Sequence, residues 1–174
     1  REGRCPGPVA ANRAGIVCIF QELSLMPDLS VADNIGIASP PRRFGLIDNR
    51  AQRRRAEELL ARVGCEDVNP LERVKNLPLS RRQMVEIAKA LARNARLLIL
   101  DEPTAALGGA EVDLLFGQIA KLRSEGVGII YISHRLEEIR RIADRVVVMR
   151  DGAKVQEFAS GDVPVRSIVE AMVG

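Results

Sequence analysis

The chain has 174 residues, 47% of them apolar, and a formal net charge of +3 at pH 7. A chain of this length and composition can bury roughly 70% of its unfolded surface, which excludes an intrinsically disordered protein. Because basic and acidic residues nearly balance, the sequence lacks the strong positive field of a dedicated nucleic-acid binder. We therefore expect no nucleic acid among its partners.

The cysteines and the apolar runs limit the kind of protein further. Cys5, Cys18 and Cys65 are odd in number and far apart, so a reducing compartment fits better than a disulfide framework or a zinc site. No apolar run approaches the roughly 18 residues of a membrane span, and residues 1–10 lack the apolar segment of a signal peptide. The chain does not begin with methionine, so we expect a soluble fragment of a longer protein.

Short apolar runs rich in β-branched residues predict the strands. Continuous apolarity without alternation is typical of strands that are covered on both faces, as in a parallel sheet. Four segments have this pattern: 15–20, 97–100, 127–133 and 145–149.

A long insert between the first two strands predicts a helical subdomain over about residues 25–93. The segment 48–64 carries an apolar stripe (Ala56, Leu59, Leu60 and Val63), with its arginines facing out. A solvated helix face explains these arginines better than a nucleic-acid contact does, because Glu57 and Glu58 stand beside them. A second helix has its apolar positions at helical spacing: Met84, Ile87, Ala88 and Leu91.

The remainder of the chain, residues 94–174, predicts the rest of an α/β core. A helix follows the second strand and ends near Gly126, with one apolar face made of Val112, Leu115, Phe116, Ile119 and Leu122. Strand, helix and strand in succession predict a parallel crossover. A short helix comes next, with inward residues Leu136, Ile139, Ile142 and Ala143. A turn at 150–152, a weaker strand at 153–158 and a last helix near 165–173 complete the chain.

Polar residues that could do chemistry follow three of the predicted strands. Ligands gather at the carboxyl ends of parallel strands, and these ends carry Gln21, the pair Asp101 and Glu102, and then Ser133 with His134. Adjacent carboxylates after an apolar strand are costly unless a cation satisfies them.

These residues allow a catalytic interpretation and simpler ones. In the catalytic interpretation Mg²⁺ is bound, Asp101 could hold the metal through water, and Glu102 acts as general base. Taken singly, the acidic pair could be a surface cap, His134 an ordinary residue of a turn, and Gln21 a solvated loop residue.

Four segments together resemble the nucleotide-binding subunit of an ABC transporter, in the monosaccharide-importer branch. They read IFQELSLMPDLSVADNI, VEIAKAL, LLILDEPTAAL and GIIYISHRLEEIRRIADRVVVMRDG, and the likeness extends from Ala14 to Gly174. It implies an α/β fold of the P-loop NTPase type, a parallel sheet flanked by helices with a helical subdomain insert. ATP and Mg²⁺ are the implied cofactors.

The resemblance also assigns roles to single residues. Gln21 corresponds to the Q-loop glutamine, which senses Mg²⁺ and the transmembrane partner, and Asp101 to the Walker B aspartate that holds the metal. Glu102 corresponds to the catalytic glutamate and His134 to the switch histidine that contacts the γ-phosphate. The segment 105–108 occupies the D-loop, where Gly108 replaces a commonly acidic residue.

The sequence departs from the family pattern at the phosphate site. A P-loop requires GxxxxGK[ST], and no Gly-Lys pair occurs in this chain. Only twenty residues precede Gln21, so we expect the N-terminal part with the P-loop and the adenine-stacking aromatic to be missing. The chain alone should then bind ATP poorly and show no measurable hydrolysis.

A second departure concerns the signature segment, which resembles LSGGQ in the family. Counting back from Asp101 gives LPLSR from Leu77, whereas LSRRQ from Leu79 restores three signature residues but needs a two-residue deletion. We prefer the ungapped register, because losing two residues would rotate the apolar helix face by about 200°. Pro78 then falls in the first helical turn. Ser80 and Arg81, or Arg82, would contact the ATP of the opposing subunit.

These observations leave three functional hypotheses. The first is a partial ABC domain of a subunit that hydrolyses ATP to energise carbohydrate import at the cytoplasmic face of the membrane. Its partners would be permease subunits, a second nucleotide-binding domain and, indirectly, a sugar-binding protein. The second hypothesis is a non-catalytic, truncated or degenerate ABC domain. The third, an ABC-type ATPase of DNA repair or translation, is disfavoured because those relatives carry larger inserts between Q-loop and signature.

Overall fold

The computed structural model describes residues 7–159 and 164–173, so the expectations for Cys5, residues 1–6 and Gly174 lie outside the described residues. The chain divides into two compact units, Arg1–Ile130 and Tyr131–Gly174. Within the described residues, no helix is long and apolar enough to cross a bilayer.

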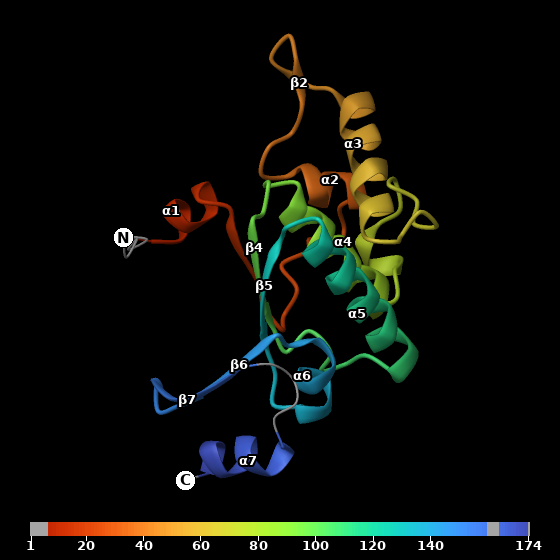
Figure 1. The fold of residues 1–174 in the computed structure, drawn as a ribbon. Coiled ribbons are helices and arrows are strands. Elements are labelled where there is room, and N and C mark those ends of the chain that lie inside the picture. The colour runs from red at the N-terminus through yellow and green to blue at the C-terminus, as the bar shows by residue number, and fades with distance from the viewer. Residues whose placement is uncertain (1–6, 160–163, 174) are drawn as a thin grey trace. The chain divides into compact units, whose positions relative to one another are not determined.

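The main sheet contains three of the predicted strands in the order β1-β4-β5 (Figure 1). They are β1 (Ile16–Ile19), β4 (Leu97–Asp101) and β5 (Gly128–Ile132), and the short helix α1 (Pro8–Arg13) precedes them. β1 and β4 are parallel, with Ile16 beside Leu97 and Ile19 beside Leu100. This pair has the parallel arrangement that the apolar runs predict, whereas the fourth run, 145–149, lies outside this sheet in an antiparallel hairpin.

Burial is one-sided in β1 and incomplete in β4 and β5, which corrects the expectation of cover on both faces. In β1 the side chains of Val17 and Ile19 are buried while that of Cys18 between them is exposed. In β4 the residues Leu98 and Leu100 are buried and their neighbours are half-buried. Continuous apolarity identified the strands correctly, but it did not report which face helices cover.

Three helices between β1 and β4 pack against one another through the predicted apolar stripes. They are α2 (Val31–Gly36), α3 (Asn49–Arg62) and α4 (Leu79–Leu91), with the 3-10 turn η1 (Val74–Asn76) before α4. Ser30 and Asp48 cap α2 and α3 by accepting hydrogen bonds from the backbone N–H groups of Asp33 and Ala51. The side chains of both predicted stripes are buried: Ala56, Leu59, Leu60, Val63, Met84, Ile87, Ala88 and Leu91.

Two details of this helical part differ from the sequence expectations. Arg55 does not face out fully, because its guanidinium donates to the carbonyl oxygens of Ser39 (3.0 Å) and Ala92 (2.5 Å). Pro78 is the N-cap of α4, with extended backbone (φ −62°, ψ 158°), and therefore precedes the first helical turn. Its side chain offers no acceptor to the first amides of the helix.

A small hairpin of β2 (Arg42–Arg43) and β3 (Leu46–Ile47) precedes α3 and was not expected from the sequence (Figure 1). Arg42 pairs with Ile47 and Arg43 with Leu46, so Phe44 and Gly45 form a two-residue turn. Both have positive φ, 51° and 84°. A left-handed conformation costs a residue with a side chain about 1–2 kcal/mol, so Phe44 is an unfavourable choice for this turn.

The helix α5 (Gly109–Ser124) follows β4 and buries the predicted face of five residues. Gly126 lies just beyond its end with a φ of 86°, and its N–H donates to the carbonyl of Arg123 (2.9 Å). A left-handed residue at this position closes a helix at little cost only when it is glycine, as the sequence predicts.

The unit Tyr131–Gly174 contains α6 (Leu136–Ile142), β6 (Arg145–Arg150), β7 (Ala153–Ala159) and α7 (Val165–Val173). β6 and β7 form an antiparallel hairpin with a turn at Asp151 and Gly152, where φ is 53° and 76°. The core of this unit consists of Val146, Val148, Ile168 and Ala171, with Leu136, Ile139, Ala143 and Phe158 packed against them. Burial in β6 alternates, so this apolar run is covered on one face.

Candidate functional site

The ends of β1 and β4 bring three of the sequence-predicted residues to one edge of the sheet. Because Ile19 is registered with Leu100, the residues that follow the two strands leave the sheet side by side. Gln21 comes two positions after β1, whereas Asp101 ends β4 and Glu102 follows it. The Gln21 side chain is exposed and the two carboxylates are half-buried.

The backbone at Glu102 is unusual. Its φ of 46° lies in the left-handed region, which a glutamate adopts at a cost of about 1–2 kcal/mol. Two hydrogen bonds hold the bend, from Ala105 N–H to the Glu102 carbonyl (3.2 Å) and from Leu107 N–H to the Thr104 carbonyl (3.1 Å). Strain of this kind is often found at functional sites.

The Asp101 carboxylate acts on a neighbouring thiol at this edge. The pKa of the Cys18 thiol is raised, first by its partial burial and then by the charge of Asp101. The Asp101 carboxylate therefore lies close enough to Cys18 for its charge to act on the thiol.

The donor atoms at the edge fit magnesium. Mg²⁺ prefers oxygen ligands and is usually held by one or two carboxylates together with waters and substrate phosphates. Asp101 offers a carboxylate at the end of β4, and Gln21 an amide oxygen just after the neighbouring strand β1. In residues 7–159 and 164–173, no group of three or more His, Cys, Asp or Glu side chains could hold a metal by itself. The donor set suits a metal shared with phosphate.

The beginning of α4 carries Ser80 and Arg81, the residues that we compare with the family signature. Ser80 hydrogen-bonds the carboxylate of Glu111, which also accepts the N–H of Gly108 (2.9 Å). The Gly108 N–H first, and Ser80 second, lower the pKa of Glu111. The signature-like segment is therefore tied to the first turn of α5 and to the segment after Glu102.

Arg81 and Arg82 are both engaged within the helical part of the chain. Arg81 forms an ion pair with Asp67 (2.9 Å) and approaches the Cys65 sulfur at 3.4 Å. Arg82 donates to the carbonyl oxygens of Leu77 (2.8 Å) and Lys75 (2.7 Å). Neither guanidinium would reach an outside phosphate without breaking contacts that now hold the start of α4.

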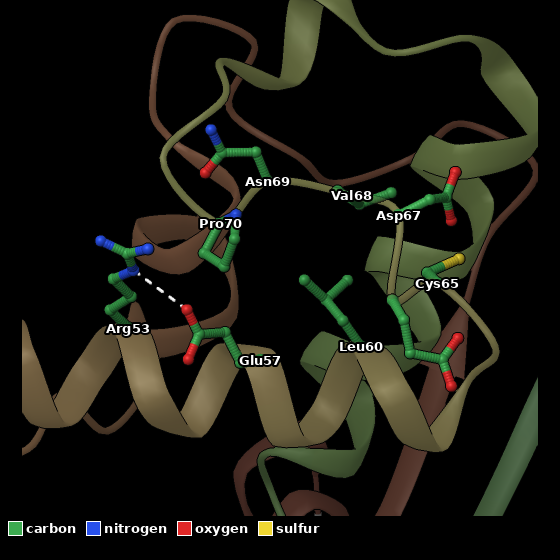
Figure 2. Close-up of a pocket in the computed structure, with 9 residues that line it drawn as sticks. Arg53, Glu57, Leu60, Cys65, Asp67, Val68, Asn69 and Pro70 are labelled. Carbon is green, nitrogen blue, oxygen red and sulfur yellow. Dashed lines mark hydrogen bonds and ion pairs between the residues drawn. The ribbon is translucent and has the colours of Figure 1, made fainter.

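Cys65 and Asp67 also line an open pocket beside α3 (Figure 2). On the α3 side of this pocket, the Arg53 guanidinium and the Glu57 carboxylate form an ion pair between successive helical turns (3.0 Å). Burial is the main reason that the pKa of the Cys65 thiol is raised. The other lining residues are Leu60, Glu66, Val68, Asn69 and Pro70. None of the predicted site residues lines this pocket.

A polar network around two buried side chains, Glu86 and Lys89, connects the loop after Gln21 to α4, and sequence reasoning missed it. The Ser24 hydroxyl donates to Glu86 (2.5 Å), and the Lys89 ammonium donates to the Ser24 carbonyl (2.9 Å) and hydroxyl (2.7 Å). The Lys89 ammonium is also 3.5 Å from the Glu86 carboxylate, and both side chains are less than a tenth exposed. This network fixes the loop three residues after Gln21 against a rigid helix.

His134 belongs to the other unit, in the turn between β5 and α6, and its side chain is exposed. Beside it, the Ser133 hydroxyl accepts the Arg135 N–H (3.0 Å), and Glu138 binds the Tyr131 hydroxyl (2.7 Å) and the Arg135 guanidinium (2.8 Å). Glu138 thus organises the turn that presents the histidine.

Comparison with known proteins assigns this arrangement to a family. Residues 7–105 match the sequence profile of the ABC transporter family. Ribose import ATP-binding protein RbsA 1 of Mesorhizobium japonicum is 60% identical over the whole chain, and RbsA 2 of Streptomyces coelicolor is 49% identical over 99% of it. The chain spans 34% and 33% of these two proteins, about a third of the length of the curated relatives that it matches.

Solved structures show the same fold. The ADP conformation of MJ1267, an ATP-binding cassette of an ABC transporter, has a TM-score of 0.78 at 21% identity, over 96% of this chain and 71% of that one. A dimeric post-hydrolysis state of the cassette MJ0796, bound to ADP and Pi, has a TM-score of 0.71 at 25% identity. It covers 87% of this chain and 66% of that one.

Proposed function

Because the chain belongs to the ABC transporter family, we propose that it is part of an ATP-hydrolysing subunit that energises import of a sugar, with ribose as the first candidate. One observation carries the proposal: Gln21, Asp101 and Glu102 share the carboxyl edge of two registered parallel strands. Ribose is the sugar named for the relatives, the first of which is 60% identical over the full chain.

In this proposal each residue has one task at the site. ATP and Mg²⁺ supply the transferable phosphoryl group and the charge that neutralises it. Asp101 and Gln21 orient the metal, and Glu102 takes the proton of the attacking water as general base. His134 contacts the γ-phosphate. Ser80 and Arg81 would face the nucleotide of an opposing domain, as the family signature does.

The proposed partners are permease subunits and a second nucleotide-binding domain, either in tandem or in a dimer. The MJ0796 structure is dimeric, which supports pairing of cassettes. A sugar-binding protein would act indirectly through the permease. Together these partners place the protein at the cytoplasmic face of the membrane. We also retain the division into a helical subdomain at 25–93 and a core part at 94–174.

A chimera tests the proposal. The 174 residues replace the aligned third of the Mesorhizobium japonicum relative, and the chimera is expressed with that relative's permease and sugar-binding protein. We expect ribose uptake and ATP hydrolysis that depend on the permease. A folded chimera that binds ATP and the permease but supports neither would contradict the proposal.

The alternative of a non-catalytic domain rests on a specific observation at α4. Pro78 caps this helix without a side-chain hydrogen bond and lacks an N–H group, so the segment offers fewer donors than a serine- and glycine-rich signature would. If the chimera binds ATP and pairs with its partner but hydrolyses nothing, this second function replaces the first.

A further inference from the structure

The hairpin of residues 40–48, which we call the basic hairpin, exposes apolar side chains at its tip. The exposed fractions are 93% for Phe44, 75% for Leu46 and 53% for Ile47. Cross-strand partners share a face of a hairpin, so Arg43 lies with Leu46 and Arg42 with Ile47. Each face therefore combines one cation with one aliphatic side chain.

Positive charge is concentrated around this tip. Residues 42–55 contain six arginines and a single acidic residue, Asp48, in a chain whose net charge is only +3. Arg42 and Arg43 are exposed and form no ion pair with the described residues, although the Arg43 guanidinium lies 5.4 Å from the centre of the Phe44 ring. Arg53 is paired with Glu57, and Arg55 with backbone carbonyls. The available charge is thus that of the hairpin together with Arg50 and Arg54, which are exposed on the adjoining helix α3.

Folding does not account for Phe44. A two-residue turn with positive φ at both positions favours Asn, Asp or Gly at the first of them, where this chain has an almost fully exposed phenylalanine. Among the described residues, the ring lies against the guanidinium of the neighbouring Arg43. The exposed ring therefore stands at a position whose backbone conformation favours another residue, and strain of this kind is often found at functional sites.

We propose that the basic hairpin binds an anionic lipid surface. Phe44, Leu46 and Ile47 enter the boundary between headgroups and acyl chains, while Arg42 and Arg43 contact headgroup phosphates. Aromatic and aliphatic residues next to arginines suit a surface that has negative groups above hydrocarbon. Nucleic acid offers the charge without the hydrocarbon. Lipid binding by the hairpin requires neither nucleotide nor permease, so it can be tested independently of the proposed transport function.

Sedimentation of the purified 174-residue chain with vesicles tests the proposal. We expect binding to vesicles that contain phosphatidylglycerol, weaker binding when salt is added, and much weaker binding to pure phosphatidylcholine. Equal binding to the two kinds of vesicle would overturn the role of the arginines. Absence of binding to the anionic vesicles would overturn the proposal as a whole. The tip would then be expected to bind in a groove of a partner protein.

Two variants and a matched control sharpen the test. Phe44→Asn suits the turn and keeps every charge, and it should lower the partition coefficient about tenfold. Arg42→Gln combined with Arg43→Gln should lower it by roughly fivefold for each charge removed. Leu71→Asn removes another exposed apolar side chain, outside the hairpin, and should leave binding unchanged. Circular dichroism verifies the fold, and wild-type binding by a folded Phe44→Asn chain would contradict the insertion of the tip.

Discussion

The carboxyl edge of β1 and β4 and the N-terminus of α4 differ in how closely they follow the ABC pattern. The edge keeps the glutamine and both carboxylates, and the strand register alone brings them together. The helix start has a proline cap, and its arginines are committed to Asp67, Leu77 and Lys75. A site set by strand register needs few residues, whereas one made of helix amides is weakened by a single proline.

The largest expected effect is on kcat, and it tests the carboxyl edge of β1 and β4. Glu102→Gln in the chimera should lower kcat by roughly 10² to 10⁴, because it removes the proposed general base, while ATP binding persists. Glu58→Gln, on the exposed face of α3, is the matched control and should leave kcat unchanged. Loss of ATP binding in Glu102→Gln to the same extent as kcat would show that the residue has another role.

The next effect concerns the network that holds the loop after Gln21. Lys89→Met leaves the buried Glu86 carboxylate without its cation, so the free energy of unfolding should fall by about 3–5 kcal/mol. Urea denaturation of the 174-residue chain measures it. Lys75→Met removes an exposed pair with Asp28 and should cost much less, because water screens the two charges. Similar losses in both variants would show that burial does not distinguish these pairs.

A smaller effect tests the helix start directly. Pro78→Ser supplies a side-chain acceptor for the first amides of α4 and should raise the free energy of unfolding by about 0.5–2 kcal/mol. Pro78→Ala provides no acceptor and is the control. A stability gain that is equal in the two variants would mean that the proline ring, rather than the missing cap, weakens this helix.

The smallest effect concerns Glu111, which links the two regions. Its pKa is lowered in the folded chain, chiefly by the Gly108 N–H, so its contribution to stability is present above the unfolded pKa and is lost as pH falls through the folded one. An NMR titration of the side-chain carboxyl should show the lowered value. Ser80→Ala should reduce the lowering only in part, and a complete return to the ordinary value would make Ser80 the main cause.

The sequence predicted the elements well because their patterns are local. The α5 face and the α3 stripe follow helical spacing, and the turns at Gly126 and at Asp151–Gly152 use residues that tolerate positive φ. The strand ends located Gln21, Asp101 and Glu102 without any side-chain contact being known. Their catalytic roles, and those of Ser80, Arg81 and His134, remain predictions.

Features that depend on distant residues were missed. Ser24 is far from Glu86 and Lys89 in the sequence, although a charged pair three residues apart on an apolar helix face was a usable signal. The partners of Arg81 lie in the segment that follows α3, which no local pattern indicates. One-sided burial of β1 and β6 was missed because an apolar side chain is not obliged to be covered.

The left-handed backbone of Glu102 has a consequence for variation at this position. A library of substitutions selected only for folding should retain Gly, Asn and Asp, since these residues tolerate positive φ, and should disfavour Val, Ile and Thr. A library selected for turnover should retain glutamate. The two selections should therefore favour different amino acids at position 102. The difference between the two surviving sets would measure how strongly catalysis, as opposed to backbone conformation, determines which amino acid follows β4.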